Sequence, residues 1–285
     1  MGSIPVSVVI AAHNESRVID RCLDTLLGSG DSDGLDITVV ANGCHDDTAA
    51  RARAHPGVRV IELAAPSKVA ALNLGDSQAR GFPRLYLDAD IELTPRDVGL
   101  LAAALGDGVL ASAPRRRVDT DGRPWSVRSY YAVSHALGAF DGRLFGRGAV
   151  MLSAQGRARF THFPPVLSDD LFLDQLFGVE EKCQVDAVTA TVAAPFSTGA
   201  LTRRLVRVKA GNASLPGIPS RHGPRGALKR VGAGIAVAWR EPKLGPACVA
   251  YGCLTGYAEL RARVRGNRVP WGQDRSTRGL QAAQV

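Results

Sequence analysis

"IPVSVVIAAHNESRVIDRCLDTLL", residues 4–27, decides the fold of this chain. Its first nine letters are almost continuously apolar, which is typical of a strand buried on both faces of a sheet. Its second half repeats apolar residues at helical spacing: Val18, Ile19, Cys22, Leu23, Leu26 and Leu27. A buried strand followed directly by an amphipathic helix is how a parallel sheet covered by helices begins. The stretch therefore predicts an α/β fold.

The same alternation of strand and helix patterns continues to about residue 114. Short β-rich runs occur at 36–40, 58–63, 84–90 and 108–114, with helical patterns between them at 46–55, 67–80 and 94–105. Ser67 and Thr94 are expected to cap the last two helices, and Pro95 suits a first helical position. This order favours a mostly parallel, Rossmann-like central sheet flanked by helices.

The pattern changes after Pro114. It predicts, in order, a basic loop at Arg115–Arg117, an amphipathic segment near 125–137, a strand within 145–153, a helix that starts near residue 168, and a strand or hairpin at 183–194. From about residue 198 onward the helical segments are basic. We therefore expect a main domain over residues 1–215, a C-terminal helical extension packed on it over 216–265, and a disordered basic tail over 266–285.

The composition is that of an ordinary globular protein, with 45% hydrophobic and 22% charged residues in 285. The five cysteines form no CxxC pair, which favours a reducing compartment over a disulfide framework. No basic region precedes the apolar run near the start, and the nearest candidate for a membrane span, 244–258, is too short. These features predict a cytoplasmic location.

The net charge of +8 is unevenly distributed along the chain. Residues 201–285 contain 16 Lys and Arg but only three Asp and Glu. This basic region suits phosphate groups or an anionic lipid surface, so peripheral contact with the inner face of the membrane is one interpretation, and a solvated tail is the other. The region lacks interleaved aromatic residues, which argues against nucleic-acid binding.

A pair of carboxylates, Asp88 and Asp90, stands where the predicted strand at 84–90 ends. Residues i and i+2 of an extended chain project to the same side, and open α/β sheets bind ligands at the carboxyl ends of their strands. Carboxylate oxygens suit Mg²⁺ or Mn²⁺, which proteins commonly hold together with the phosphates of a substrate. The pair therefore predicts a divalent cation that carries a diphosphate, although two solvated acids at a strand end would look the same.

Five segments make a more specific pattern together. "VSVVIAAHNESRVIDRCLDTLL", "VVANGCHDDTA", "SKVAALNLG", "YLDAD" and "SDDLFL" occur in this order. The set resembles the family-2 glycosyltransferases of GT-A fold, densely over residues 4–93 and again around 146–175, and the likeness fades after about residue 215. The resemblance implies transfer of a sugar from a nucleotide diphosphate donor with inversion at the anomeric carbon.

The resemblance also implies which residues hold the donor. The turn from Ala12 to Glu15 matches the family's nucleotide-contacting segment, and its position at a helix N-terminus predicts free backbone N–H groups. Ala41 stands where the family commonly has an acid, which weakens the case for uracil and leaves Asn42 to read the base. A UDP-sugar remains the favoured donor, with GDP- and dTDP-sugars as alternatives. The implied donor-binding residues are Ala12, His13, Glu15, Asn42, Lys68, Asn73, Asp88, Gly148 and Arg207.

Individual roles follow from the same resemblance. Lys68 is expected to reach the phosphate or the base as a point charge, and Asn73 to stabilise the nucleotide pocket. Gly146 and Gly148 match a segment beneath the donor sugar, where glycine permits close backbone approach. Arg147, between them, is expected to meet phosphate or acceptor.

The resemblance assigns metal binding and proton transfer to the acids of the pattern. In the family the second acid of "DAD", here Asp90, usually binds the metal, while the first, Asp88, reaches the ribose or the metal through water. Asp169 and Asp170 match the family's Glu-Asp motif. An inverting transfer needs one carboxylate to take the proton of the acceptor hydroxyl, and Asp170 is assigned this role with Asp169 as its orienting neighbour. Two adjacent carboxylates raise the pKa of one another.

One family element is absent. Processive members carry a Gln-x-x-Arg-Trp motif, but the comparable stretch here offers only Arg203, Arg204 and Arg207, one of which is expected to bind the leaving diphosphate. A single addition to a small-molecule or lipid-linked acceptor is therefore expected. Two alternatives stay open. A sugar-phosphate nucleotidyltransferase would need a Gly-rich loop where this chain has "AHNES", and a nucleotide-sugar-binding pseudoenzyme would bind the donor without consuming it.

Overall fold

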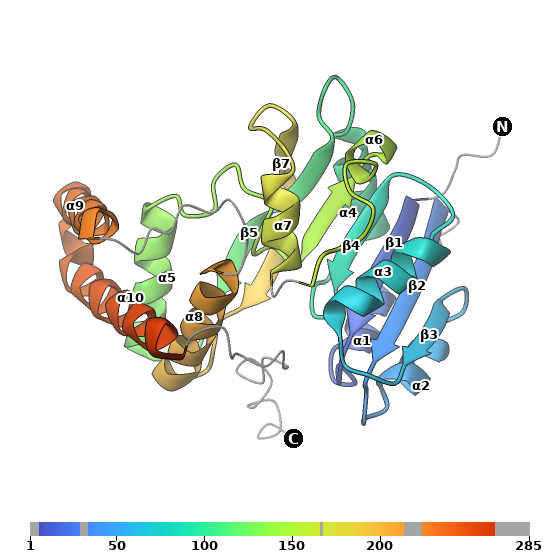
Figure 1. The fold of residues 1–285 in the computed structure, drawn as a ribbon, viewed down its shortest axis with the longest axis horizontal. Coiled ribbons are helices and arrows are strands. Elements are labelled where there is room, and N and C mark those ends of the chain that lie inside the picture. Colours follow the sequence, from blue (N-terminus) through green and yellow to red (C-terminus); the bar gives the residue numbers. More distant parts are fainter. Residues whose placement is uncertain (1–5, 29–33, 166–167, 214–223, 266–285) are drawn as a thin grey trace. The chain divides into compact units, whose positions relative to one another are not determined.

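A computed structural model describes residues 6–28, 34–165, 168–213 and 224–265 (Figure 1). Its strands form one seven-stranded sheet: β1 (Val6–Ala12), β2 (Leu35–Asn42), β3 (Arg59–Leu63), β4 (Arg84–Asp88), β5 (Ala111–Asp119), β6 (Ala149–Leu152) and β7 (Lys182–Ala193). The helices are α1 (Ile19–Leu27), α2 (Thr48–Arg53), α3 (Lys68–Gln78), α4 (Pro95–Ala103), α5 (Trp125–Ala136), α6 (Ala154–Arg157), α7 (Asp169–Gln175), α8 (Thr198–Ala213), α9 (Pro224–Arg240) and α10 (Gly245–Arg265), with a 3₁₀ turn, η2, at Pro242–Leu244.

The sheet confirms the predicted architecture. Its strand order is β3-β2-β1-β4-β6-β5-β7, and the β1–β2, β1–β4 and β2–β3 pairs are parallel. β6 runs antiparallel to both β4 and β5, so the sheet is mixed beyond β4. Parallel neighbours bring the carboxyl ends of β1, β2 and β4 to one edge, which is where an open α/β sheet holds its ligand.

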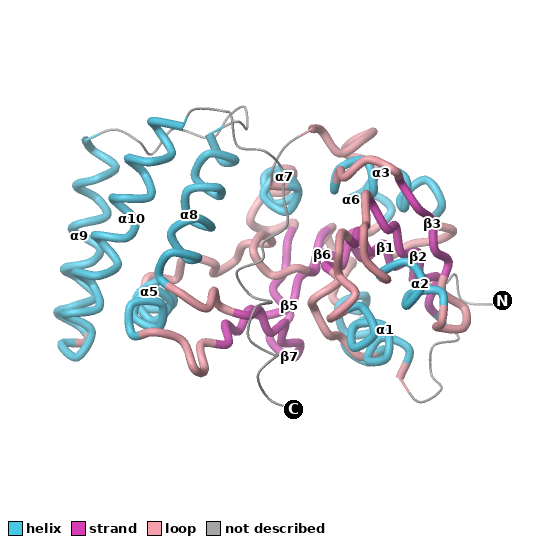
Figure 2. The backbone as a smooth tube through the Cα atoms, turned by 90° about the horizontal axis from the view of Figure 1, so that it is seen from below, coloured by secondary structure: helices cyan, strands magenta, loops and turns pink. Residues whose placement is uncertain are grey.

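Burial along β1 explains why its sequence is apolar throughout. Val8 and Ile10 join a core cluster with side chains of α1 and α4, whereas Val9 joins a second cluster with side chains of α3 and α7. Figure 2 shows α1 and α3 on opposite sides of β1 and β2. All three β1 side chains are fully buried. The strand is therefore covered on both faces, as the sequence predicts.

Helix α3 packs closely on the sheet. A Cβ atom at Gly75 would lie 2.5 Å from Cγ1 of Val9 and 3.2 Å from Cγ2 of Val40, so only glycine allows this spacing. Ser67 caps the helix by accepting a hydrogen bond from the backbone N–H of Ala70, and Thr94 caps α4 in a capping box with Asp97. Both predicted caps are confirmed.

A buried charged cluster ties α3 to β4 and α6. One oxygen of Asp76 accepts hydrogen bonds from Arg84 Nη1 at 2.7 Å and from the Tyr86 hydroxyl at 2.6 Å. The other accepts from Arg157 Nη2 at 2.6 Å. Burial raises the pKa of Asp76, but the hydrogen bonds from Arg157, Tyr86 and Arg84 outweigh it and hold this pKa below its usual value. We call these four residues the Asp76 cluster.

The predicted basic loop at Arg115–Arg117 is wrong, because these residues belong to β5. Nε of Arg117 donates a hydrogen bond to the Thr191 hydroxyl of β7 at 3.3 Å. β7 lies next to β5 in the sheet and gives its second half a partner. A strand whose partner lies some 70 residues away in the sequence cannot be recognised from local composition alone.

The described chain clusters into two compact units. Unit 1 contains residues 1–117, 142–165 and 169–192, and unit 2 contains residues 118–141, 166–168 and 193–285. The domain boundary predicted at 215/216 does not coincide with this division, since both sides of it fall in unit 2, and it stays a prediction. The predicted tail, 266–285, lies outside the described residues. Within those residues, no helix combines the length and the apolar composition needed to cross a membrane.

Candidate active site

The carboxyl ends of three parallel strands define the site in unit 1. Ala12 of β1 is in register with Ala41 of β2, and Ala11 is in register with Asp88 of β4. Each strand leads into a loop that carries polar residues. The register therefore brings the Ala12–Glu15 turn, Asn42 and the Asp88 turn to the same edge of the sheet, as expected for a ligand site.

The turn after β1 is fixed by the loop after β2. Asn14 adopts a left-handed φ of 53°, and the backbone N–H of Glu15 donates to the Thr48 hydroxyl at 2.7 Å. The N–H of Ser16 donates to Asp46 Oδ2 at 3.1 Å, and the N–H of Asn14 lies 3.4 Å from the sulfur of Cys44. The expectation of free N–H groups in this turn is therefore wrong for residues 14–16, because the 44–48 loop accepts them.

His13 and Asn42 join the ends of β1 and β2. Nδ1 of His13 lies 2.6 Å from the Asn42 carbonyl oxygen. The Asn42 side chain is buried; its amide donates to the Ala12 carbonyl at 2.8 Å and accepts from the N–H of Ser67 at 3.0 Å. These bonds position the start of α3 against the strand ends. Contact of Asn42 with a nucleotide base stays a prediction.

Lys68, the first residue of α3, lies between two carboxylates. Its Nζ is 2.8 Å from Oδ1 of Asp88 and 3.0 Å from Oδ1 of Asp169. The lysine thus joins the end of β4 to the start of α7. We call Lys68, Asp88 and Asp169 the Lys68 cluster.

The electrostatics of this cluster distinguish its members. Burial lowers the pKa of Lys68, but the carboxylates of Asp169 and Asp88 outweigh it and hold this pKa well above its usual value. Burial raises the pKa of Asp169 to about 6; Lys68 opposes the rise, while Asp170 and Asp88 add to it. Asp170 therefore raises the pKa of Asp169, as expected of an adjacent acid.

The geometry of the Asp88–Asp90 pair differs from the expectation. β4 ends at Asp88, and the Asp88 carbonyl accepts the N–H of Ile91 at 3.1 Å, which closes a turn around Ala89 and Asp90. Asp90 is therefore an exposed turn residue, and the two acids do not share one face of an extended strand. The strand ends earlier than predicted because the polar residues there complete a tight turn.

The glycine segment 146–148 supports this turn and the acids of α7. The Asp88 N–H donates to the Gly148 carbonyl at 2.7 Å. Gly148 has a φ of +68°, and a Cβ there would lie 2.5 Å from Cγ1 of Ile91 and 3.2 Å from Oδ2 of Asp88. The close approach that glycine permits is thus made by the Asp88–Ile91 turn.

Asp170 is held by backbone groups. Its Oδ2 accepts the N–H of Gly146 at 2.6 Å, and its Oδ1 accepts the N–H of Leu171 at 2.8 Å. Asp169 and Asp170 lie in the first turn of α7, as the sequence predicts. The glycine segment therefore touches Asp170 at one end and Asp88 at the other, which connects the two predicted functional acids through three residues.

Arg147 and Asn73, two further residues named from the sequence, bond to other parts of unit 1. Arg147 is buried, and its guanidinium donates to the Pro114 carbonyl at 2.6 Å and to Gln184 at 2.7 Å, so its assignment to phosphate or acceptor is wrong. Asn73 makes two hydrogen bonds with the backbone of Phe163, at 2.8 and 3.2 Å, across 90 residues of sequence. Contact of Asn73 with the nucleotide stays a prediction.

Asp174 was not recognised from the sequence. It is buried, pairs with Lys182 Nζ at 2.8 Å, and accepts the N–H of Leu144 at 2.8 Å. Its contacts fix the loop that leads to Gly146. The available signal was an acid four residues after Asp170, inside the otherwise apolar run of "SDDLFLDQLF". Arg207 lies on α8 in unit 2, and its contact with the donor stays a prediction.

The carboxylates at the end of β4 are suitable ligands for a hard divalent cation. Among the described residues, no group of three or more His, Cys, Asp or Glu side chains could hold a metal alone. Asp88 and Asp90 supply carboxylate oxygens from one turn. Mg²⁺ and Mn²⁺ sites of this kind use one or two carboxylates and complete their coordination with substrate phosphates. The residues are thus suited to a metal that arrives with a diphosphate.

Comparisons with known proteins identify the family and the fold of the chain. Residues 7–158 match the family model described as "Glycosyl transferase family 2". No curated protein sequence matches the chain. The mannosyltransferase PcManGT from Pyrobaculum calidifontis, solved with GDP-Man and Mn²⁺, aligns over 93% of this chain and 88% of its own, with 18% identity and a TM-score of 0.63.

A second solved structure is similar over a shorter part. Glucosyl-3-phosphoglycerate synthase from Mycobacterium tuberculosis, in complex with Mn²⁺ and UDP-Glc, aligns over 76% of this chain and 80% of its own, with 24% identity and a TM-score of 0.52. Identities this low show a shared fold, and the family model covers more than half of the chain. The chain belongs to glycosyl transferase family 2 and is a nucleotide-sugar glycosyltransferase of GT-A fold.

Proposed function

We propose that the chain moves a hexose from a nucleotide diphosphate donor to an acceptor hydroxyl in a single displacement that inverts the anomeric carbon. The observation that carries this proposal is the position of Lys68 between Asp88 and Asp169. Asp88, which is assigned to the donor side, and Asp169, the neighbour of the assigned base, meet at one ammonium group. Donor and acceptor chemistry can therefore occur side by side at this edge of the sheet.

Asp170 is the general base in this proposal. The acceptor oxygen forms its bond to the anomeric carbon as the bond from that carbon to the diphosphate breaks, and the acceptor proton passes to the Asp170 carboxylate. Backbone N–H groups of Gly146 and Leu171 fix this carboxylate while leaving each oxygen a second lone pair. Asp169 instead holds Lys68, and Lys68 offsets the repulsion among the acids around it.

The donor is a UDP- or GDP-hexose bound with Mn²⁺ or Mg²⁺. Asp90 and Asp88 would hold the cation, which neutralises the departing diphosphate when it is bound. PcManGT was solved with GDP-Man and Mn²⁺, and this supports a hexose donor and a metal. The acceptor is a small-molecule or lipid-linked hydroxyl, and the transfer is non-processive because the Gln-x-x-Arg-Trp pattern is missing from the sequence.

The stereochemistry of the product tests this proposal. The purified chain is incubated with Mn²⁺, UDP- or GDP-hexoses and a panel of acceptors, and the anomeric configuration of the product is read by proton NMR. Inversion is expected, and retention would require a different mechanism from the single displacement. A chain that binds a donor in calorimetry but releases no nucleoside diphosphate with any acceptor would instead fit the pseudoenzyme interpretation.

A further inference from the structure

Helix α10 carries an exposed apolar stripe within unit 2. Five of its side chains are exposed: Val249, Cys253, Tyr257, Leu260 and Val264. Leu260 is 60% and Val264 is 76% exposed. Steps of about 100° per residue place all five within an arc of about 80° on one side of the helix. Buried Ala258 and Ala262 on the other side join a core cluster with residues of α5 and α8. We call the five exposed residues the α10 stripe.

A second apolar pair lies on the neighbouring helix. Ile235 and Trp239 of α9, one turn apart, are 55% and 83% exposed. Figure 2 shows α9 beside α10. An exposed Trp next to apolar side chains is common where a protein meets a bilayer, because its ring suits the boundary between headgroups and acyl chains.

Basic residues border the α10 stripe. By the same geometry Arg261 lies on one margin, about 40° beyond Tyr257, and Arg263 lies on the other, about 40° before Val249. Nη2 of Arg263 pairs with Glu259 at 2.9 Å, whereas the stem of Arg261 can lie along apolar surface while its guanidinium group reaches a phosphate. The surrounding sequence has the same sign, since residues 201–285 contain 16 Lys and Arg and three Asp and Glu.

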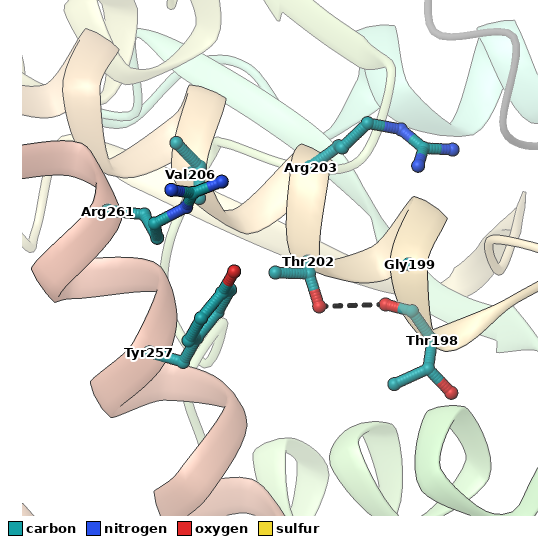
Figure 3. Close-up of a pocket in the computed structure, with 7 residues that line it drawn as sticks. All are labelled: Thr198, Gly199, Thr202, Arg203, Val206, Tyr257 and Arg261. Atoms are coloured by element: carbon teal, nitrogen blue, oxygen red, sulfur yellow. Dashed lines mark hydrogen bonds between the residues drawn. The ribbon is translucent and has the colours of Figure 1, made fainter. Parts of the chain in front are cut away.

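A pocket between α8 and α10 lies at the edge of the α10 stripe. It has a volume of about 420 Å³ and is lined by Thr198, Gly199, Thr202, Arg203, Val206, Tyr257 and Arg261. Figure 3 shows the Tyr257 hydroxyl and the Arg261 guanidinium beside Thr202 and Val206, while the Arg203 guanidinium extends away from them. No acid lines the pocket, and no carboxylate of the described residues pairs with Arg203 or Arg261. A phosphate group matches these donors.

We propose that unit 2 docks on an anionic phospholipid bilayer through the α10 stripe, with a lipid phosphate bound in the pocket at Arg261 and Tyr257. The helix lies in the plane of the interface and does not cross the membrane. Charge decides between the occupants of this face. A second copy would bring an equally basic region against the first, whereas an anionic lipid surface complements it. This proposal does not rest on the identity of the donor or the base.

Sedimentation with vesicles tests the proposal. The full chain is mixed with vesicles of phosphatidylcholine alone or of phosphatidylcholine and phosphatidylglycerol in equal amounts. Binding to the anionic vesicles is expected, with at most weak binding to the neutral ones. The double variant Leu260→Gln/Val264→Gln should lose affinity for anionic vesicles by roughly tenfold or more, because each side chain then loses its apolar contact with the acyl boundary. Arg261→Gln should weaken binding severalfold on anionic vesicles only.

Val179→Gln is the matched control, because Val179 is 78% exposed but lies in unit 1. It should bind like the unchanged chain, and circular dichroism checks that each variant is folded. If the double variant does not fold, Val264→Gln alone and Arg261→Gln carry the test. Absence of binding to anionic vesicles overturns the proposal. So does a dimer in sedimentation equilibrium that Leu260→Gln/Val264→Gln converts to a monomer, because the stripe would then be covered by a second copy.

Discussion

The Asp76 cluster and the Lys68 cluster lie at opposite ends of α3 and differ in their access to solvent. The side chain of Asp76 is only 7% exposed, and both of its oxygens accept hydrogen bonds from Arg or Tyr donors. In the Lys68 cluster, Asp88 is 41% and Lys68 is 27% exposed. A closed, saturated cluster stabilises the fold, whereas an open one can exchange its partners for a ligand. Charged side chains at one end of α3 therefore satisfy one another within the fold, and those at the other end are the ones that we propose to bind the donor.

Replacement of the acid beside the open cluster should have the largest effect. We expect Asp170→Asn to lower kcat by roughly a thousandfold while donor affinity stays nearly constant, because the base acts only during the displacement. Steady-state kinetics and donor titration by calorimetry measure the two quantities. Near-normal turnover in Asp170→Asn together with a severe loss in Asp169→Asn would transfer the role of base to Asp169.

Replacement at the closed cluster should act on folding instead. Asp76→Asn leaves Arg84 and Arg157 without a charged partner in a buried place, and we expect it to lower the free energy of unfolding by about 3 kcal/mol. Urea unfolding measures the loss. Asp20→Asn is the control, since the Asp20–Arg51 pair is exposed and should be worth less than about 1 kcal/mol. Equal losses in the two variants would remove the distinction between closed and open charge pairs.

Asp90, the proposed metal ligand next to the Lys68 cluster, should affect donor binding and not folding, in contrast to Asp76. We expect Asp90→Asn to weaken donor binding in Mn²⁺ by about a hundredfold, with no comparable change in urea unfolding, because Asp90 is an exposed turn residue. Donor titration with and without Mn²⁺ measures this. Asp107→Asn, another exposed turn acid, should bind the donor normally. Full donor affinity in Asp90→Asn would defeat the assignment of Asp90 to the metal.

Removal of the central cation should have a smaller effect. Lys68→Met keeps the length of the side chain but leaves Asp88 and Asp169 without their shared partner, so we expect roughly tenfold weaker donor binding. The pKa of Asp169 should rise further, because Lys68 opposes its rise. The carbon-13 shift of the Asp169 carboxyl group, followed against pH, should therefore change at a higher pH in the variant than in the unchanged chain. Identical pH profiles would indicate that Lys68 does not hold Asp169 in solution.

The smallest effect concerns acid stability. The pKa of Asp76 is lower in the folded chain than in the unfolded chain, so its contribution is complete above the unfolded value near 4 and is lost as pH falls through the folded value. The difference in unfolding free energy between the unchanged chain and Asp76→Asn should therefore shrink as pH falls below about 4. Urea unfolding of both chains over this range measures it, and a constant difference would show that the low pKa of Asp76 does not support the fold.

Much of the fold could be predicted because its signals are local. The apolar run of β1, the cap at Ser67 and the cap at Thr94 each depend on residues close in sequence, and all three are confirmed. The second half of β5 could not be predicted in this way, because its partner strand lies far along the chain.

The site shows the same limit. The types and order of the acids identified the family, but their contacts are long-range. Asn73 is bonded to Phe163 across 90 residues, and Lys68 reaches Asp169 on a helix about 100 residues away. Arg147 looks like a phosphate ligand in the sequence, yet its guanidinium is satisfied by carbonyl oxygens inside unit 1. Motifs therefore indicate which residues take part in the site, whereas the contacts that each residue makes depend on the packed structure.

The close packing of α3 on the sheet limits which positions of this enzyme can be redesigned. Gly75 allows α3 to contact Val9, and Lys68 is the first residue of the same helix. A larger residue at position 75 would push α3 away from the sheet. Lys68 would then move away from Asp88 and Asp169, although no residue of the site is replaced. Attempts to alter donor preference should leave this helix intact, and Gly43 as well, because a Cβ there would lie 2.6 Å from the backbone nitrogen of Pro66, just before the N-cap of α3.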